Sequence, residues 1–138
     1  MKEENKIILY QDDNEITRVS VRFADEDLWL TQNQLADIYQ TSKSNVSEHI
    51  KHIFEDGELD KTVVVRNFRI TTQHGAMEGK TQSRDVAHYN LDMIIALGYR
   101  VQSQVATRFR RWAIQRLHEY LQKGFAMDDE RLKQGGNR

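Results

Sequence analysis

Two amphipathic segments, each preceded by a helix-capping residue, follow each other directly between residues 31 and 55, and they constrain the fold more than any other feature. Thr31 can cap the first turn of a helix, and Gln34 is placed to reach back to it in a capping box. The apolar side chains that follow have helical spacing and stop before residue 40: Leu35, Ile38 and Tyr39. The pattern predicts a short helix that begins after Thr31.

A second helix is predicted from Ser42, which is a favourable N-cap. Its apolar face carries Val46, Ile50, Ile53 and Phe54. The two helices are therefore expected to be joined by about three residues, the spacing of a helix-turn-helix, and the small Ala36 lets them approach closely.

The outward face of the second helix carries polar side chains suited to a DNA major groove. Asn45 can pair with adenine, and Lys43 can bind guanine or phosphate. The DNA-binding candidates on this helix are Lys43, Ser44, Asn45, Ser47, His49 and Lys51. Two features weaken this interpretation: Gln40 stands where such a turn usually has glycine, and Glu48 opposes the lysines. A helical hairpin used only for packing or protein contact is the alternative.

The next segment predicts a two-stranded ribbon. Residues 62–72 and 86–89 have strand character, and residues 73–82 between them contain two glycines. The apolar residues of the first strand fall on both of its faces, which suggests a slip or bulge: Val63 and Val65 on one face, and Val64, Phe68 and Ile70 on the other. A ribbon directly after a helix-turn-helix matches the wing of a winged helix, whose cations can touch phosphate or the minor groove: Arg66, Arg69, Lys80 and Arg84. An ordinary hairpin with solvated cations is the alternative.

Strands and helices are also predicted on both sides of this unit. Residues 6–10 and 16–23 should form an N-terminal hairpin, the second strand alternating cleanly between apolar and polar residues. Asn90 should cap a short helix over residues 91–97, with Gly98 as its stop.

A long helix is predicted from about Ser103 to Lys123, ended by Gly124. Arg108 and Arg111 lie on one side of it, where they can clamp backbone phosphate or pair with the acidic N-terminal half. We expect this helix to pack on the domain or to mediate a homodimer.

The expected fold is α+β: a winged helix-turn-helix-like domain with an N-terminal β-hairpin and a long C-terminal helix. Residues 1–28 form the hairpin and residues 29–126 the rest of the same domain. Residues 127–138 are expected to be a tail or a linker to a further C-terminal region.

Charge is distributed unevenly along the chain, although the net charge is only −1. Residues 1–60 carry 6 basic and 14 acidic side chains, giving −8, and residues 61–111 carry 9 basic and 3 acidic, giving +6. A local positive field around the ribbon is therefore compatible with an acidic total.

Several other classes of function are disfavoured. The chain has no cysteine, and His49 and His52 are three residues apart, whereas a helical metalloprotease pair is spaced by four. No catalytic motif, signal peptide or apolar run of membrane length is present. We therefore expect a cytoplasmic protein that is not an enzyme, with no metal, cofactor, small-molecule substrate or membrane partner.

Five stretches resemble the RhuM family of bacterial virulence-associated proteins. They are residues 29–36 (WLTQNQLA), 45–59 (NVSEHIKHIFEDGEL), 89–101 (YNLDMIIALGYRV), 109–113 (FRRWA) and 123–133 (KGFAMDDERLK). The 89–101 block is the most specific, and the FRRWA stretch is also similar to phage antirepressor domains of the Bro type. The resemblance implies a bacterial protein of genomic islands or mobile elements whose helix-turn-helix binds DNA, with no catalytic residues to carry over.

The expected function is that of a DNA-binding transcription regulator that reads duplex DNA through a helix-turn-helix and a basic wing. The alternative is a protein-interaction or dimerisation module of a virulence or mobile-element protein, with no direct DNA contact. The −8 charge of the half that holds the second helix favours the alternative.

Overall fold

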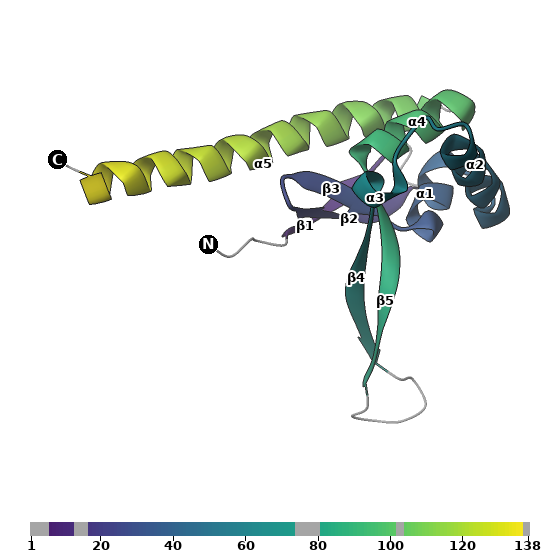
Figure 1. The fold of residues 1–138 in the computed structure, drawn as a ribbon, viewed down its shortest axis with the longest axis horizontal. Coiled ribbons are helices and arrows are strands. Elements are labelled where there is room, and N and C mark those ends of the chain that lie inside the picture. The colour runs from purple at the N-terminus through teal and green to yellow at the C-terminus, as the bar shows by residue number, and fades with distance from the viewer. Residues whose placement is uncertain (1–5, 13–16, 74–80, 102–103, 137–138) are drawn as a thin grey trace.

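The computed structural model describes residues 6–12, 17–73, 81–101 and 104–136, and its α+β architecture confirms the predicted class (Figure 1). The described elements, in chain order, are β1 (Lys6–Gln11), β2 (Arg18–Ala24), β3 (Asp27–Leu30), α1 (Gln32–Tyr39), α2 (Lys43–Glu55), α3 (Lys61–Val64), β4 (Val65–Gln73), β5 (Thr81–Asn90), α4 (Leu91–Val101) and α5 (Gln104–Gly136). The strands form one antiparallel sheet in the order β1-β2-β3-β5-β4.

Helices α4 and α5 lie along one side of the sheet, and α1 and α2 stand at one end (Figure 1). The main core forms where these elements meet, and its fully enclosed side chains include Phe23, Leu30, Leu35, Ile53, Met93, Leu97 and Phe109. Burying one such side chain is worth roughly 1.5–3 kcal/mol. Because the core contains residues of the sheet and of α1, α2, α4 and α5, it joins the sheet to both helix pairs. Beyond the core, α5 extends far past the sheet (Figure 1).

The first three strands form a meander that the sequence predicted in part. Val19, Val21 and Phe23 of β2 are buried while Arg18 and Ser20 are exposed, which confirms the predicted alternation. Strand β3 was not predicted. A two-residue turn of Asp25 and Glu26 leads into it, and both turn residues have positive φ, 54° and 60°. Such turns match the twist of antiparallel strands but usually contain glycine or asparagine.

Val63 and Val64 lie in a short helix, α3, so they need no slip or bulge within a strand. Asp60 caps α3 by accepting hydrogen bonds from the amide and hydroxyl of Thr62, at 2.9 and 2.8 Å. This single turn buries Val64 and leaves Val63 exposed. Strand β4 therefore begins at Val65, three residues later than predicted.

Two glycines predicted to end helices lie inside them. Helix α4 continues past Gly98 to Val101, and Gly98 packs against α1 and α5: a Cβ there would lie 3.6 Å from the Tyr39 hydroxyl and 3.8 Å from the Cβ of Ala106. Helix α5 continues past Gly124 to Gly136. A glycine costs a helix only about 1 kcal/mol, which good helix formers on both sides offset. Residues 127–136, expected to form a tail, are helical.

No helix in the described part of the chain combines the length and apolar character that crossing a membrane requires.

Candidate nucleic-acid interface

Local features define the start of α1 and the turn between α1 and α2. Thr31 and Gln34 form the predicted capping box, with the Gln34 amide donating to Thr31 Oγ1 at 3.2 Å and the Thr31 amide to Gln34 Oε1 at 2.9 Å. Ser42 caps α2 by accepting from the Asn45 amide at 3.0 Å. Between the caps, Gln40 adopts the left-handed conformation with φ of 54°. Gln40 thus takes the backbone shape for which glycine is usually selected.

The outward face of α2 is open to solvent. Lys43, Ser44, Asn45, Ser47 and Lys51 are exposed, and His49 is half-buried. The buried residues of the same helix are Val46, Ile50 and Ile53, as the apolar spacing predicted. The side-chain amide of Asn45 donates from Nδ2 to Thr41 Oγ1 at 2.9 Å, and this bond holds the side chain over the first turn of α2.

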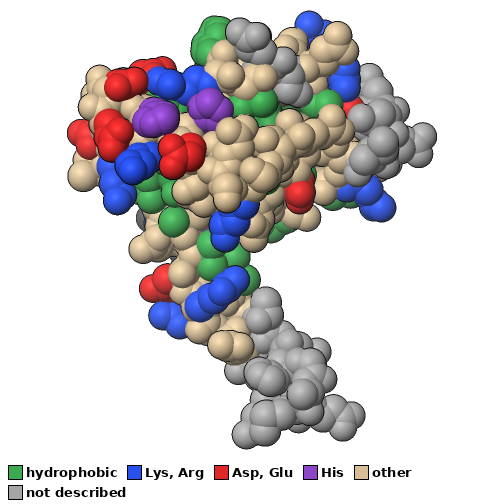
Figure 2. Space-filling model, turned by 90° about the vertical axis from the view of Figure 1, so that its right-hand side faces the viewer, with side chains coloured by type: hydrophobic (Ala, Val, Ile, Leu, Met, Phe, Trp, Pro, Cys, Tyr) green, Lys and Arg blue, Asp and Glu red, His purple; other side chains and the backbone are tan. Residues whose placement is uncertain are grey.

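Charges of both signs alternate on this face. Glu48 lies 3.7 Å from His52 on the next turn of α2. At the far end of α2, Arg100 of α4 lies 3.4 Å from Asp56 and 3.1 Å from Glu58. Figure 2 shows basic, acidic and histidine side chains close together in this region. The end of α2 that begins at Lys43 is therefore the end best suited to an anionic partner.

Strands β4 and β5 form a ribbon that leaves the body of the protein. Strand β3 pairs with only Tyr89 and Asn90 of β5, and the ribbon projects beyond that point (Figure 1). Residues opposite each other in β4 and β5, such as Ile70 and Arg84, share a face. Because strand side chains alternate, Arg66 and Arg84 lie on one face and Arg69 on the other. Lys80 lies outside the described residues.

Two of the ribbon's arginines have carboxylate partners. Arg66 forms an ion pair with Asp25 in the β2–β3 turn, and Arg69 lies 3.5 Å from Asp85 on β5. Both pairs are partly exposed, so each is worth little in water and can be exchanged for phosphate.

The base of the ribbon is fixed by a second small cluster, formed by Trp29, Phe68 and Ala24. The Trp29 indole donates to the Ala24 carbonyl at 2.9 Å, and its ring meets Phe68 edge-on. The guanidinium groups of Arg22 and Arg66 lie over the Phe68 ring, at 4.7 and 5.0 Å. This cluster packs the part of the ribbon nearest β3 against the sheet.

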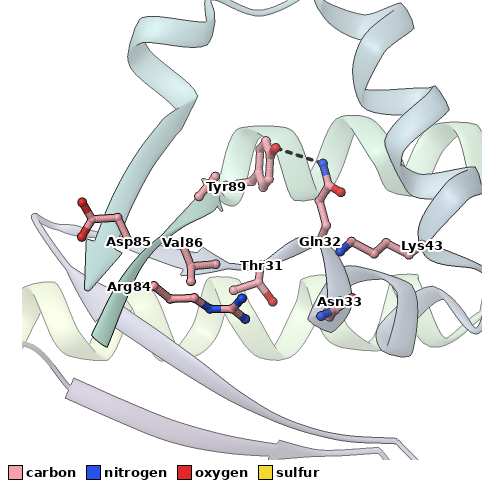
Figure 3. A pocket seen from close by; sticks show the side chains of 9 residues that line it. Thr31, Gln32, Asn33, Lys43, Arg84, Asp85, Val86 and Tyr89 are labelled. Atoms are coloured by element: carbon pink, nitrogen blue, oxygen red, sulfur yellow. Dashed lines mark hydrogen bonds between the residues drawn. The ribbon is translucent and has the colours of Figure 1, made fainter. Parts of the chain in front are cut away.

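A groove of about 340 Å³ lies between the ribbon and the helix pair (Figure 3). It is lined by Thr31, Gln32, Asn33, Lys43, Arg84, Asp85, Val86, Ala87 and Tyr89. Arg84 reaches over it from β5 and Lys43 from the start of α2, on opposite sides, while the Asp85 carboxylate points away from both (Figure 3). The structure thus brings together one predicted residue of the second helix and one of the ribbon.

Hydrogen bonds between buried and half-buried polar groups link the elements beside this groove. Gln32 donates from Nε2 to the Tyr89 hydroxyl at 3.1 Å, which links α1 to β5. Asp27 accepts from Asn90 Nδ2 at 3.1 Å and from the Leu91 amide at 3.4 Å, and burial raises the pKa of its carboxyl. Asn90 caps α4, as predicted, by accepting from the Met93 amide at 3.3 Å. Burial also lowers the pKa of His88, whose ring packs edge-on against Phe68.

The two arginines predicted on the long helix have different surroundings. Arg108 binds the buried carboxylate of Asp12, whereas Arg111 is exposed on α5. Thr31, Gln32, Asn33 and Tyr89 line the groove but were not predicted as site residues. The capping signal of Thr31 located the start of α1 in the sequence, yet it carried no information on which strand that start would face.

Among the residues that the structure describes, no three or more histidine, aspartate or glutamate side chains gather in a way that could hold a metal ion. The groove is lined by hydrogen-bonding side chains, by Lys43 and Arg84, and by Asp85.

Comparison with known proteins identifies one family. The family described as "Virulence protein RhuM family" matches residues 63–138, more than half of the chain, and the match includes the ribbon, α4 and α5. No curated protein and no solved structure matches the chain. Helices α1 and α2 precede the matched residues. By this match, the chain belongs to the RhuM family of virulence proteins.

Proposed function

We propose that this protein is a DNA-binding regulatory module of the winged helix-turn-helix type, with α2 in the major groove and the β4–β5 ribbon as the wing. Helix α2 presents Lys43, Asn45 and Ser47 to solvent, side chains that can bind base edges and phosphates. We also assign it to the cytoplasm, where duplex DNA is accessible.

The observation that carries this proposal is the shared groove. Lys43 and Arg84 come from the two elements that a winged helix uses on DNA, and they line one depression. Pairing of β3 with β5 supports the same arrangement, because β3 leads directly into α1 and so ties the helix pair to the ribbon. A duplex lying across the groove can touch both elements at once.

The mixed charge of α2 sets the expected strength of binding. Only Lys43 and Lys51 are basic on its exposed face, and Glu48 opposes them. The electrostatic contribution must therefore come largely from the ribbon, through Arg66, Arg69, Lys80 and Arg84. We expect micromolar, strongly salt-dependent binding to mixed-sequence DNA, and tighter binding at a preferred site.

A titration of the full chain with mixed-sequence duplex at low salt tests the proposal, with fluorescence anisotropy as the readout. A dissociation constant below roughly 100 μM supports it, because ordinary non-specific binding is at least that tight. Lys43→Ala should weaken binding, and Lys80→Ala should reduce the salt dependence by about one ion. Failure to bind at roughly 100 μM would reject the proposal.

The second candidate function is protein interaction or homodimerisation without DNA contact. Helix α5 favours it, because it extends beyond the sheet and leaves Ile114 and Leu121 exposed, 49% and 40%. Light scattering separates a monomer from a dimer. A subunit interface that covers Asn45 and Lys51 would favour this function over DNA binding.

A further inference from the structure

We propose that the groove between β5 and the start of α1 is the seat of a single phosphodiester of the DNA backbone, held jointly by Lys43 and Arg84. This inference rests on the proposed DNA-binding function and assigns a specific contact within it. One anchored phosphate would fix the angle at which the ribbon and α2 meet the duplex.

The geometry of the groove favours one anion between two cations. Arg84 and Lys43 extend toward the same space from opposite sides, one from a strand and the other from a helix (Figure 3). The acidic residue that lines the groove, Asp85, points its carboxylate away from this space, and that carboxylate lies 3.5 Å from Arg69. The positive charge in the groove is therefore not neutralised by the acidic residue that lines it.

Neutral donors complete the coordination that a phosphate needs. Thr31 and Asn33 line the groove beside Arg84, and their hydroxyl and amide groups can donate to phosphate oxygens (Figure 3). Arg84 offers two parallel N–H donors and Lys43 a mobile point charge, so the two side chains can bind different oxygens of one phosphate.

The walls of the groove fit a phosphate that belongs to a polymer. The depression is open to solvent, whereas a small-molecule pocket encloses most of its ligand. Val86, Ala87 and Tyr89 of β5 also line the groove and add apolar atoms that can contact a sugar. The exposed face of α2 and the ribbon continue on either side, where the neighbouring phosphates would lie.

A shared phosphate makes a quantitative prediction. Cations on separate phosphates contribute independently, so the losses from Lys43→Ala and Arg84→Ala should multiply in the double variant. If both hold one phosphate, removing either cation loses most of the joint effect. The double variant should then lose at least threefold less affinity than the product of the single losses.

The experiment is a double-mutant cycle on duplex binding, measured by anisotropy at two salt concentrations. Lys51 provides the matched control, because it is an exposed lysine of α2 that does not line the groove. The losses from Lys51→Ala and Arg84→Ala should multiply. Circular dichroism of each variant verifies that it is folded. Arg84→Lys tests whether a positive charge at position 84 is enough for the duplex affinity.

The outcomes separate this inference from the proposed function. Non-multiplying losses for the Lys43–Arg84 pair, with multiplying losses for the Lys51–Arg84 pair, support the shared phosphate. Duplex binding in which both pairs multiply would overturn the inference and leave DNA binding intact. No duplex binding at all would overturn both. A titration with inorganic phosphate is the last test. In one outcome, phosphate binds with a submillimolar dissociation constant and loses that binding in both Lys43→Ala and Arg84→Ala, while the losses in duplex affinity multiply. That result would assign the groove to a free phosphoryl ligand and overturn the inference.

Discussion

Arg108 of α5 donates two hydrogen bonds, each 2.8 Å long, to the carboxylate of Asp12 at the end of β1. Asp12 is only 3% exposed and also accepts from the Tyr10 hydroxyl at 2.7 Å. A carboxylate at such depth is stable only because a cation and hydrogen bonds replace its water. Arg108 therefore anchors the long helix to the sheet, and this contact is a pairing with the acidic N-terminal half, the predicted alternative to a phosphate clamp.

Replacing Arg108 should cost stability because it leaves the Asp12 charge buried without this cation. We expect Arg108→Ala to lower the free energy of unfolding by about 2–3 kcal/mol, measured by urea denaturation. Arg111→Ala, on the same helix but exposed, is the control and should change it by less than about 0.5 kcal/mol. Equal effects of the two substitutions would contradict the anchoring role.

The protein should be more stable with glycine than with glutamine at position 40, where the backbone is left-handed. Because Gln40 has φ of 54°, its Cβ crowds the backbone, a cost that glycine avoids. We expect Gln40→Gly to raise stability by about 0.5–1 kcal/mol and the melting temperature by roughly 2–4 °C. Asp37→Gly, in the exposed interior of α1, should do the opposite. A destabilising Gln40→Gly would show that the turn depends on the glutamine side chain.

Stability should fall as the pH is lowered toward 5. Burial lowers the pKa of His88 in the folded protein, so the unfolded chain binds this proton more readily as the pH falls. Stability contributed by neutral His88 is thus present above the ordinary histidine pKa and lost below it. Urea titrations at pH 7.5 and 5.5 should show a smaller difference for His88→Gln than for the wild type. His118→Gln, an exposed control on α5, should keep the wild-type difference.

Removing one acidic charge from α2 should strengthen DNA binding. Glu48 is exposed among the candidate contact residues, and its carboxylate repels phosphate. We expect Glu48→Gln to tighten duplex binding about two- to fivefold at low salt, with the gain shrinking as salt is added. Glu119→Gln on α5 should leave the affinity unchanged. If Glu48→Gln weakened binding, α2 would not face the DNA.

The sequence predicted those parts of the fold that local chemistry determines. The caps at Thr31, Ser42 and Asn90 are each formed by a side chain within three residues of the amide it binds, so their signals could be read directly. The buried face of α2 followed from apolar spacing in the same way.

A turn without glycine and the features that depend on distant contacts were not predictable. Strand β3 follows a turn of Asp25 and Glu26, neither of which signals positive φ as glycine does. The sequence left open whether Arg108 binds phosphate or pairs with the acidic N-terminal half, because its partner Asp12 lies 96 residues away along the chain. The meeting of Lys43 and Arg84 at one groove likewise depends on how the ribbon leaves the sheet, which residue patterns do not encode.

The most direct test of a joint DNA interface is a titration of the isotope-labelled chain with duplex DNA, followed by backbone amide NMR. Signals of residues 43–51 on α2 and 82–86 on the ribbon should shift together, with the largest changes at Lys43 and Arg84. Shifts confined to α5, or none on α2 when the ribbon responds, would contradict the account.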